Sequence, residues 1–305
     1  MASYLLSRLL QSLLLVIGVV ALVFFMIRLT GDPTALILGR QATMEQRAAF
    51  RAEYGFDRPV SEQFVNYVGD IMRGDLGDSL SLNVPNLELI GQRLPATFEL
   101  ALASLLLAIV VAIPLGVASG MFPRSPFDYL ARAVGLAGQT IPSFWLAMIL
   151  ILVFAVELRW LPSFGRDSLN SLVLPALALA LGAMGQLVRL TRSAVLEIRS
   201  ANFIRTARAK GLRPSMVASR HVLPNVAIPL ISVIGLQFTY LLGGSIYIET
   251  IFAWPGLGSL LNNAIRDSDY LLVQAITIFI ALFAISINFL TDIVYGWVDP
   301  RIRRN

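Results

Sequence analysis

The stretch FIRTARAKGLRPSMVASRHVLPN, residues 203–225, decides how the chain must be arranged. It lies between two long apolar segments, and its five basic side chains are Arg205, Arg208, Lys210, Arg213 and Arg220. An arginine or lysine at the centre of a bilayer costs about 2.5 to 3.5 kcal/mol on insertion scales, so five of them cannot lie in lipid. Short loops rich in arginine are retained in the cytoplasm, so this stretch is predicted to be a cytoplasmic loop between two membrane spans.

The composition extends this prediction to the whole chain. Of its 305 residues 56% are hydrophobic and 14% are charged, and the mean hydropathy is +0.73. Soluble domains are about 25% charged. Six apolar runs approach the roughly 20 residues that a helix needs to cross the hydrocarbon core. They are about Leu5–Ile27, Thr97–Met121, Val134–Val156, Leu172–Val188, Ala227–Ile248 and Leu271–Val294. The first run is too long for a signal peptide, so the sequence predicts an all-α polytopic membrane protein with six spans.

The charges of the connections orient these spans. The 189–220 connection has eight basic residues against Glu197, and three arginines follow residue 300. The 249–270 connection, by contrast, has only Arg266 against three acidic residues. Since positive charge marks the cytoplasmic side, both termini are predicted to be cytoplasmic.

A long insertion separates the first two spans. Residues 28–96 hold seven arginines and nine acidic residues, and apolar side chains recur there at helix-like spacing: Phe50, Tyr54, Phe56, Phe64, Tyr67, Val68 and Ile71. We expect short amphipathic helices that lie over the membrane mouth. The predicted units are 1–27, the cytoplasmic N-terminus and first span; 28–96, the periplasmic insertion; and 97–305, a five-span core with its cytoplasmic loop at about 189–225.

The residues that enzyme chemistry needs are missing. A P-loop requires a lysine followed by serine or threonine, but the only lysine, Lys210, is followed by Gly211. Cysteine is absent and His221 is the only histidine, so no metal cluster is expected. The acidic residues Glu99 and Glu249 fall near span ends, as does Asp292, whereas a proton relay would cross the bilayer. We expect the energy for transport to come from a separate subunit.

Several short motifs occur in one order along the chain. They are GDP at 31–33, YGFDRP at 54–59, GDLG at 74–77, RLPAT at 93–97, IPSFW at 141–145, ETIFAWPGLG at 249–258 and DPR at 299–301. With these motifs the chain resembles, from end to end, the inner-membrane permease of bacterial binding-protein-dependent ABC importers, in the dipeptide, oligopeptide, glutathione and nickel branch. The resemblance implies a type I importer permease fold in the bacterial inner membrane.

The resemblance also gives residues 203–225 a role. In this family an E-A-A-x3-G-x9-I-x-L-P pattern forms a short coupling helix that docks into the ATPase. Arg205, Thr206 and His221 stand where the pattern has Glu, Ala and Ile. The predicted coupling residues are Arg205, Thr206, Ala207, Arg208, Ala209, Lys210, Gly211, Leu223 and Pro224. We expect the small side chains of Ala207 and Ala209 to let the partner approach, and Gly211 to end the helix in the left-handed conformation.

As the resemblance implies, the chain is a translocation subunit and not an enzyme. It would import a dipeptide, an oligopeptide or glutathione by alternating access. The implied partners are a second homologous permease, two cytoplasmic ABC ATPases, a periplasmic substrate-binding protein and the lipid bilayer. No nucleic acid is expected. ATP and magnesium would be bound by the ATPases, and no cofactor by this chain. Nickel or another small solute stays an alternative substrate, and an ATP-independent carrier is a further alternative.

The predicted role as a translocation subunit points to two further groups of residues. The candidates for the translocation path are polar residues of the inner spans: Gln139, Thr140, Ser143, Gln186, Gln237, Thr239, Tyr240 and Asn288. Hydrogen bonds between helices, at about 0.6 kcal/mol each, are the alternative explanation for these residues. The candidates for contact with the binding protein are Trp254, Pro255, Gly256 and Gly258, which face the periplasm in the predicted topology.

Overall fold

The computed structural model describes residues 2–29, 34, 38, 42–53 and 55–298. Over these residues the chain is helical, and the one β-type contact is an isolated bridge between Asp78 and Pro85. Five described helices are long and apolar enough to cross a membrane, and the number is six if one bent pair of helices is counted as a single span. The predicted all-α polytopic membrane protein is thereby confirmed, and its six predicted spans agree with the higher of these two numbers.

The spans and the short elements alternate along the chain. The spans are α1 (Ala2–Leu29), α5 (Asn86–Met121), the pair α6 (Pro126–Thr140) and α7 (Ser143–Leu150), α8 (Val173–Ile198), α11 (Leu223–Ile251) and α13 (Tyr270–Val298). The short elements are α3 (Met44–Glu53), α4 (Val60–Met72), η1 (Ile151–Glu157), η2 (Leu169–Leu172), α9 (Asn202–Ala209), α10 (Pro214–Val217), η3 (Ala218–Val222) and α12 (Leu257–Arg266).

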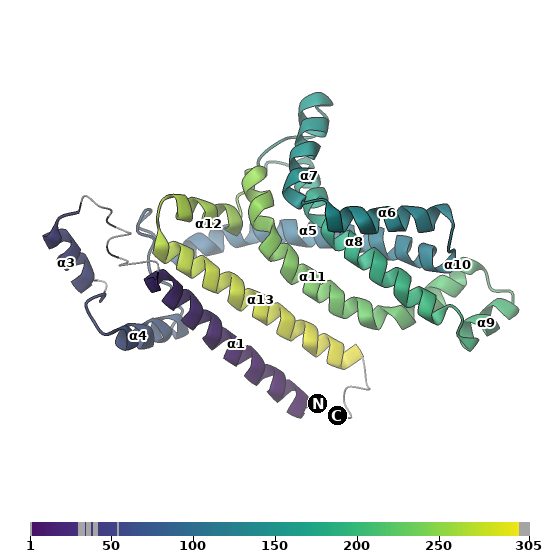
Figure 1. The fold of residues 1–305 in the computed structure, drawn as a ribbon, viewed down its shortest axis with the longest axis horizontal. Helices are drawn as coiled ribbons and strands as arrows, with labels where there is room; N and C mark the ends of the chain where they lie inside the picture. Colours follow the sequence, from purple (N-terminus) through teal and green to yellow (C-terminus); the bar gives the residue numbers. More distant parts are fainter. Residues whose placement is uncertain (1, 30–33, 35–37, 39–41, 54, 299–305) are drawn as a thin grey trace.

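The helices form an elongated bundle with two different ends (Figure 1). Helices α1 and α13 lie side by side, α11 lies next to α13, and α8 packs along α5 and α6. Helix α1 begins and α13 ends toward the end that carries α9 and α10, which we call the α9 end. Helices α3, α4 and α12 lie at the opposite end, which we call the α12 end. An even number of crossings brings both termini to one end.

Small residues allow the central helices to approach closely. A side chain at Gly138 of α6 would collide with the backbone of Leu181 and Gly185 on α8. Gly135 of α6 likewise lies against the backbone of Gly185, and α8 buries several alanines, among them Ala176, Ala178 and Ala180. Without a hydrophobic driving force between helices in lipid, this close packing is a main source of helix association.

The third span differs from the prediction. The run Val134–Val156 was expected to form one helix, but α6 and α7 meet at an angle of 107°. The break falls at Ile141 and Pro142, where Ile141 is extended with φ −88° and ψ 116°. Proline disfavours the helical conformation for the residue before it and has no N–H to continue the hydrogen-bond ladder. The apolar run is therefore continuous in sequence but bent in space.

Other span boundaries extend beyond the apolar runs. Helix α5 begins at Asn86, eleven residues before the predicted start at Thr97, so residues 86–96 of the predicted insertion are helical. Helix α8 continues to Ile198, and the elements α10, η3 and α11 follow one another without a break from Pro214. Hydropathy marks only the apolar part of a helix, whereas backbone hydrogen bonds continue the helix beyond it.

The insertion contains the two short helices α3 and α4 within its described part. A capping box starts α3, because the Gln46 N–H donates to Thr43 Oγ1 at 3.2 Å and the Thr43 N–H donates to Gln46 Oε1 at 2.9 Å. Helix α4 packs its apolar side against α1, where the rings of Phe24 and Phe64 lie 5.1 Å apart. The expected helices are present, and α4 is fastened to the first span. Tyr54 and the motifs at 31–33 and 299–301 lie outside the described residues.

A buried aspartate joins three helices near the α9 end. Asp128, 1% exposed, accepts hydrogen bonds from Ser119 Oγ at 2.8 Å and from the Arg124 N–H at 2.9 Å. It also forms ion pairs with Arg132 at 2.9 Å and with Arg192 at 2.8 Å. Since these partners come from α5, α6, α8 and the α5–α6 turn, this one carboxylate sets their spacing.

We expect Asp128→Ala to lower the free energy of unfolding by about 2 kcal/mol, because hydrogen bonds to a charged group are lost and two arginines lose their partner. Thermal unfolding of the purified chain in detergent measures this effect. The control is Asp70→Ala, whose ion pair with Arg73 is exposed and 3.8 Å long, and which is expected to change stability by less than about 0.5 kcal/mol. Equal stabilities of the two variants would contradict the role of Asp128.

Candidate functional site

Helix α9 has one side packed into the chain and one side free. Ile204 and Ala207 are 0% and 4% exposed and belong to the same buried cluster as Val217 and Val222. The outward side consists of exposed residues: Phe203, Arg205, Thr206, Arg208 and Ala209. The helix is therefore fixed to the bundle by apolar contacts while it presents a basic surface.

The end of α9 has the conformation that the sequence predicts. Gly211 has φ +75°, and its N–H donates to the Arg208 carbonyl at 2.9 Å. An added Cβ at Gly211 would meet no atom within 4 Å, so the glycine is required by its backbone conformation and not by crowding. The left-handed end of the helix is confirmed.

The small residues of α9 do not share one role. The side chain of Ala207 is buried within the chain, so the expectation that it lies against a partner is not what the structure shows. Ala209 and Gly211 are the small residues left on the outer surface. Periodicity explains the difference, because residues 204 and 207 are one helical turn apart and share the inward face.

The surface around α9 is strongly basic. Arg205, Arg208, Lys210 and Arg213 are exposed, and none of them forms an ion pair with another described residue. We call the outward residues 203, 205, 206 and 208–211, together with Arg213, the basic surface of α9. The predicted coupling residues Leu223 and Pro224 lie elsewhere, exposed in the first turn of α11. The continuous helix from Pro214 connects the two places.

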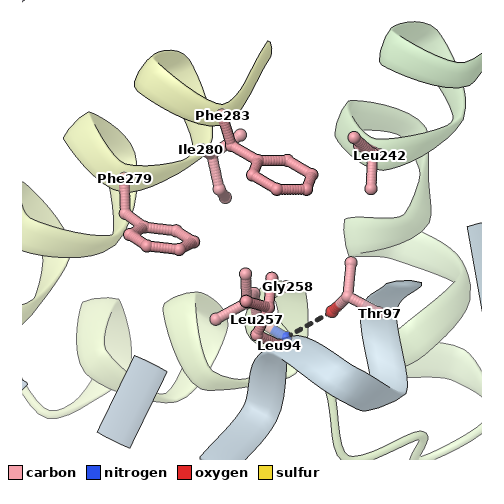
Figure 2. A pocket seen from close by; sticks show the side chains of 8 residues that line it. All are labelled: Leu94, Thr97, Leu242, Leu257, Gly258, Phe279, Ile280 and Phe283. Atoms are coloured by element: carbon pink, nitrogen blue, oxygen red, sulfur yellow. Dashed lines mark hydrogen bonds between the residues drawn. The ribbon is translucent and has the colours of Figure 1, made fainter. Parts of the chain in front are cut away.

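At the α12 end a buried carboxylate organises the turn between α11 and α12. Glu249 is 0% exposed, and its Oε1 accepts a hydrogen bond from Thr97 Oγ1 at 2.7 Å. Its Oε2 accepts from the backbone N–H of Gly258 at 2.7 Å and of Ser259 at 3.2 Å, in the first turn of α12. The Thr97 hydroxyl also accepts from the Leu257 N–H at 2.7 Å (Figure 2). A carboxylate at a helix N-terminus satisfies N–H groups that have no partner within the helix.

This network explains the spacing of the ETIFAWPGLG motif. Trp254 is 0% exposed and its indole N–H donates to the Ala96 carbonyl at 2.8 Å. A side chain at Gly256 would collide with the Glu249 carboxylate. The predicted contact residues Trp254, Gly256 and Gly258 are thus interior, and Pro255 is the partly exposed one. Contact of this turn with a binding protein stays a prediction that now depends on Pro255.

A small cavity lies between this turn and the spans. Apolar side chains of α5, α11, α12 and α13 line it, among them Leu242, Phe279 and Phe283 (Figure 2). Its volume is about 10 Å³, enough for a single water-sized sphere. It is too small and too apolar for a transported solute.

A second buried carboxylate fastens the insertion to α13. Asp269 accepts hydrogen bonds from Ser79 Oγ at 2.5 Å, from Ser81 Oγ at 2.9 Å and from the Ser81 N–H at 3.1 Å. It also caps α13 through the Leu272 N–H at 3.1 Å. Burial alone raises the pKa of Asp269, but these hydrogen bonds outweigh it and hold the pKa below its usual range.

The structure brings some of the predicted path residues together and separates others. The Gln237 side chain donates a hydrogen bond to Gln186, which joins α11 to α8. Thr239 donates to Asn288 at 3.2 Å, which joins α11 to α13. The remaining four do not form such pairs: Gln139, Thr140 and Ser143 lie at the bend between α6 and α7, and Tyr240 is 67% exposed.

Sequence reasoning missed the structural role of Thr97, Glu249 and Asp269. The first two fall inside the RLPAT and ETIFAWPGLG motifs, but hydropathy shows Glu249 only as an acid near a span end. Each of these side chains acts through partners far away in sequence, which no local pattern reveals. For Thr97 and Glu249 the motifs were a signal that marked the residues without showing their partners, and for Asp269 the motifs gave no signal.

The described residues thus form a bundle of apolar membrane-crossing helices with an exposed basic surface at one end. Comparison with known proteins identifies the family. Residues 112–304 match the family model described as the binding-protein-dependent transport system inner membrane component. Residues 1–101 match the model for the N-terminal part of such membrane components. The chain belongs to this family, which confirms the resemblance inferred from its motifs.

The relatives match the chain over almost its whole length. It is 37% identical to the oligopeptide transport system permease protein AppB of Bacillus subtilis, over 99% of both chains. It is 36% identical to the glutathione transport system permease protein GsiC of Pectobacterium atrosepticum, over 99% of both chains. The dipeptide transport system permease protein DppB of Alkalihalophilus pseudofirmus is also 36% identical, over 99% of this chain and 100% of DppB.

A solved structure supports the fold. The inward-facing MetNI methionine ABC transporter shares 20% sequence identity, with a TM-score of 0.56 over 70% of this chain and 97% of that chain. The fold is accordingly that of a type I ABC importer permease. The chain is a multi-pass inner-membrane transport subunit and not an enzyme, and ATP is hydrolysed by a separate subunit.

We expect Thr97→Val to destabilise the α12 end by about 2 kcal/mol, because Glu249 and the Leu257 N–H both lose a buried hydrogen-bond partner. Thermal unfolding in detergent measures the loss. The matched control is Thr250→Val, since Thr250 is exposed and its hydroxyl bonds only to its own helix at Ile246. If both variants unfold like the wild type, the Thr97 hydroxyl does not hold the turn.

The contribution of Asp269 should depend on pH. Because its pKa is lower in the folded chain than in the unfolded chain, its stabilisation is complete above the ordinary value of 3.8 and is lost as the pH falls through the folded value. The stability advantage of the wild type over Asp269→Asn is therefore expected to be constant near neutral pH and to shrink below pH 3.8. Unfolding curves at a series of pH values measure it, with the exposed Asp267→Asn as control. An advantage that stays constant at every pH would show that the charge is not needed.

Proposed function

We propose that this chain forms one half of the translocation path of an ATP-driven importer of short peptides, such as dipeptides, oligopeptides or glutathione. The support is that relatives named for these three substrate classes match the chain at 36 to 37% identity over 99% of its length. The other half would be a second, homologous permease. A periplasmic binding protein would deliver the peptide, and two cytoplasmic ATPases, which bind ATP and magnesium, would drive transport.

The basic surface of α9 is the structural observation that supports a partnership with the ATPases. Four exposed cationic side chains without described ion-pair partners gather around a short helix at the end of the bundle. An acidic groove on an ATPase would complement this charge and steer the encounter. In this topology the α9 end and both termini are cytoplasmic, and the insertion of residues 28–96 is periplasmic.

The packing of α9 supplies a route from the ATPase to the spans. The α9 loop connects the end of α8 to the continuous helix that runs from Pro214 into α11. Because Ile204 and Ala207 are buried in the bundle, α9 cannot move without displacing its neighbours. Movement of the ATPases would thus displace α8 and α11. This displacement would favour either the state open to the periplasm or the state open to the cytoplasm. The Gln186–Gln237 contact lies between these two helices.

Uptake by a reconstituted assembly tests the function. The chain, its second permease, the ATPases and the binding protein are placed in proteoliposomes, and entry of a labelled tripeptide is measured with and without ATP. ATP-dependent uptake of the peptide is expected. Uptake that persists without ATP and without the ATPases would instead indicate a secondary carrier, and uptake of a nickel complex but of no peptide would assign another substrate.

We expect Ala209→Trp to reduce co-purification of the ATPase by about tenfold, because a bulky side chain on the exposed face of α9 would hold the partner away. Affinity purification of the tagged chain, followed by quantification of the bound ATPase, measures this. Ala52→Trp is the matched control, since Ala52 is exposed on α3 near the opposite end of the bundle. Full ATPase binding by Ala209→Trp would remove α9 from the docking surface.

A further inference from the structure

Helix α8 carries a polar stripe that the rest of the described chain covers only in part. Gln186, Arg189 and Ser193 are exposed, and their spacing of three and four residues places them on one face of the helix. The opposite face is buried, and Thr191 and Val188 there lie against Gly116 of α5. The buried face packs α8 against α5, whereas the stripe is joined to α11 through the Gln186–Gln237 hydrogen bond.

The stripe lies where α8 passes from its apolar run, which ends at Val188, into the part that leads to α9. Arg189 is 16 residues beyond Val173, which is about 24 Å along the axis at 1.5 Å per residue. The hydrocarbon core is about 30 Å thick. Arg189 thus lies near the edge of the core on the α9 side, where its long side chain reaches water or protein instead of lipid. An exposed polar stripe at this level suits a water-filled path that another subunit completes.

A cavity of about 220 Å³ lies along this stripe. Its lining residues are Gln186, Arg189, Leu190, Ser193 and Val233, so α8 and α11 both form its walls. The Gln186 carbonyl oxygen already accepts a hydrogen bond from Gln237, which leaves the Gln186 amide NH₂ as a donor. Together with the Arg189 guanidinium and the Ser193 hydroxyl, the cavity presents mainly hydrogen-bond donors. A donor-rich wall with one positive charge suits an anionic group.

Arg189 differs from Arg192 in that it has no ion-pair partner within the described chain. Arg192, three residues further on, forms an ion pair with the buried Asp128 at 2.8 Å. Arg189 forms no ion pair with any residue that the structure describes. Of two arginines one turn apart, one is used in packing and the other points to a ligand.

We propose that Arg189, with Gln186 and Ser193, is the subsite that receives the C-terminal carboxylate of the peptide as it passes along the exposed face of α8, at the cavity that α11 also lines. This inference rests on the proposed function as a peptide importer. The planar guanidinium matches a carboxylate with two parallel N–H donors. Every linear peptide has one terminal carboxylate whatever its sequence, so a fixed arginine can guide substrates with different side chains.

The test compares a tripeptide, tri-alanine, with its C-terminal amide. Uptake of both is measured in proteoliposomes that hold the complete assembly, with the wild-type chain and with Arg189→Gln. The ratio of variant to wild-type uptake is taken for each peptide, so any selection by the binding protein cancels. We expect Arg189→Gln to slow the free acid by about tenfold and to leave the amide unchanged, because only the free acid loses a charged hydrogen bond.

The conservative variant gives a second measurement. Arg189→Lys keeps the charge and is expected to retain uptake of the free acid to within about threefold of the wild type. If the wild-type assembly takes up the free acid but not the amide, the two Arg189 variants are compared for uptake of the free acid alone. An equal loss of uptake in Arg189→Lys and Arg189→Gln would then contradict the proposal. The matched control is Arg199→Gln, which removes a positive charge just beyond the end of α8 and should affect both peptides equally. ATPase binding and thermal unfolding must be unchanged in every variant that is compared.

The outcomes separate this inference from the proposed function. A wild-type assembly that imports neither peptide would overturn the proposed function, and the subsite with it. A wild-type assembly that imports both, with Arg189→Gln slowing them equally, would overturn the subsite alone and indicate that Arg189 pairs with lipid phosphate or with the second permease. A selective loss of the free acid supports the subsite.

Discussion

The cost of placing charged groups in lipid is the constraint on which the rest of this structure depends. The chain meets it by concentrating unpaired cations at the α9 end and by burying its interior carboxylates only where donors surround them. Asp128, Glu249 and Asp269 are each at most 1% exposed, and each accepts at least three hydrogen bonds. These carboxylates, which could not lie in lipid, instead connect helices through their hydrogen bonds and ion pairs.

The three carboxylates share a position as well as a chemistry. Asp128 lies in the first turn of α6, Glu249 binds the first N–H groups of α12, and Asp269 caps α13. The N-terminus of a helix has free N–H groups and a favourable dipole for a negative charge. Each carboxylate also binds a side chain from a distant segment. Asp128 binds Arg192, Glu249 binds Thr97 and Asp269 binds Ser79. Helix ends are therefore where this fold is held to a single arrangement.

The basic surface of α9 and the polar stripe of α8 consist of exposed residues, and α8 leads directly into the loop that carries α9. Both surfaces are where we propose that other molecules bind. An element that is packed on one face and exposed on the other can pass a displacement at one end to the other. This arrangement suits a subunit whose energy source and whose transported solute meet it at different ends of the same helices.

Much of the architecture follows from local sequence patterns. Apolar runs mark the spans, because the need to satisfy the backbone in lipid acts on each segment separately. The glycine at 211 and the basic residues around it predict the end of α9, and the ordered motifs identify the family. Tertiary structure decided what depends on distant partners. These are the 107° bend at Ile141 and Pro142, the burial of Ala207, the interior position of Trp254, and the pairing of Arg192 but not Arg189. A sequence pattern reports which groups must avoid lipid, whereas only packing determines which neighbour each group finds.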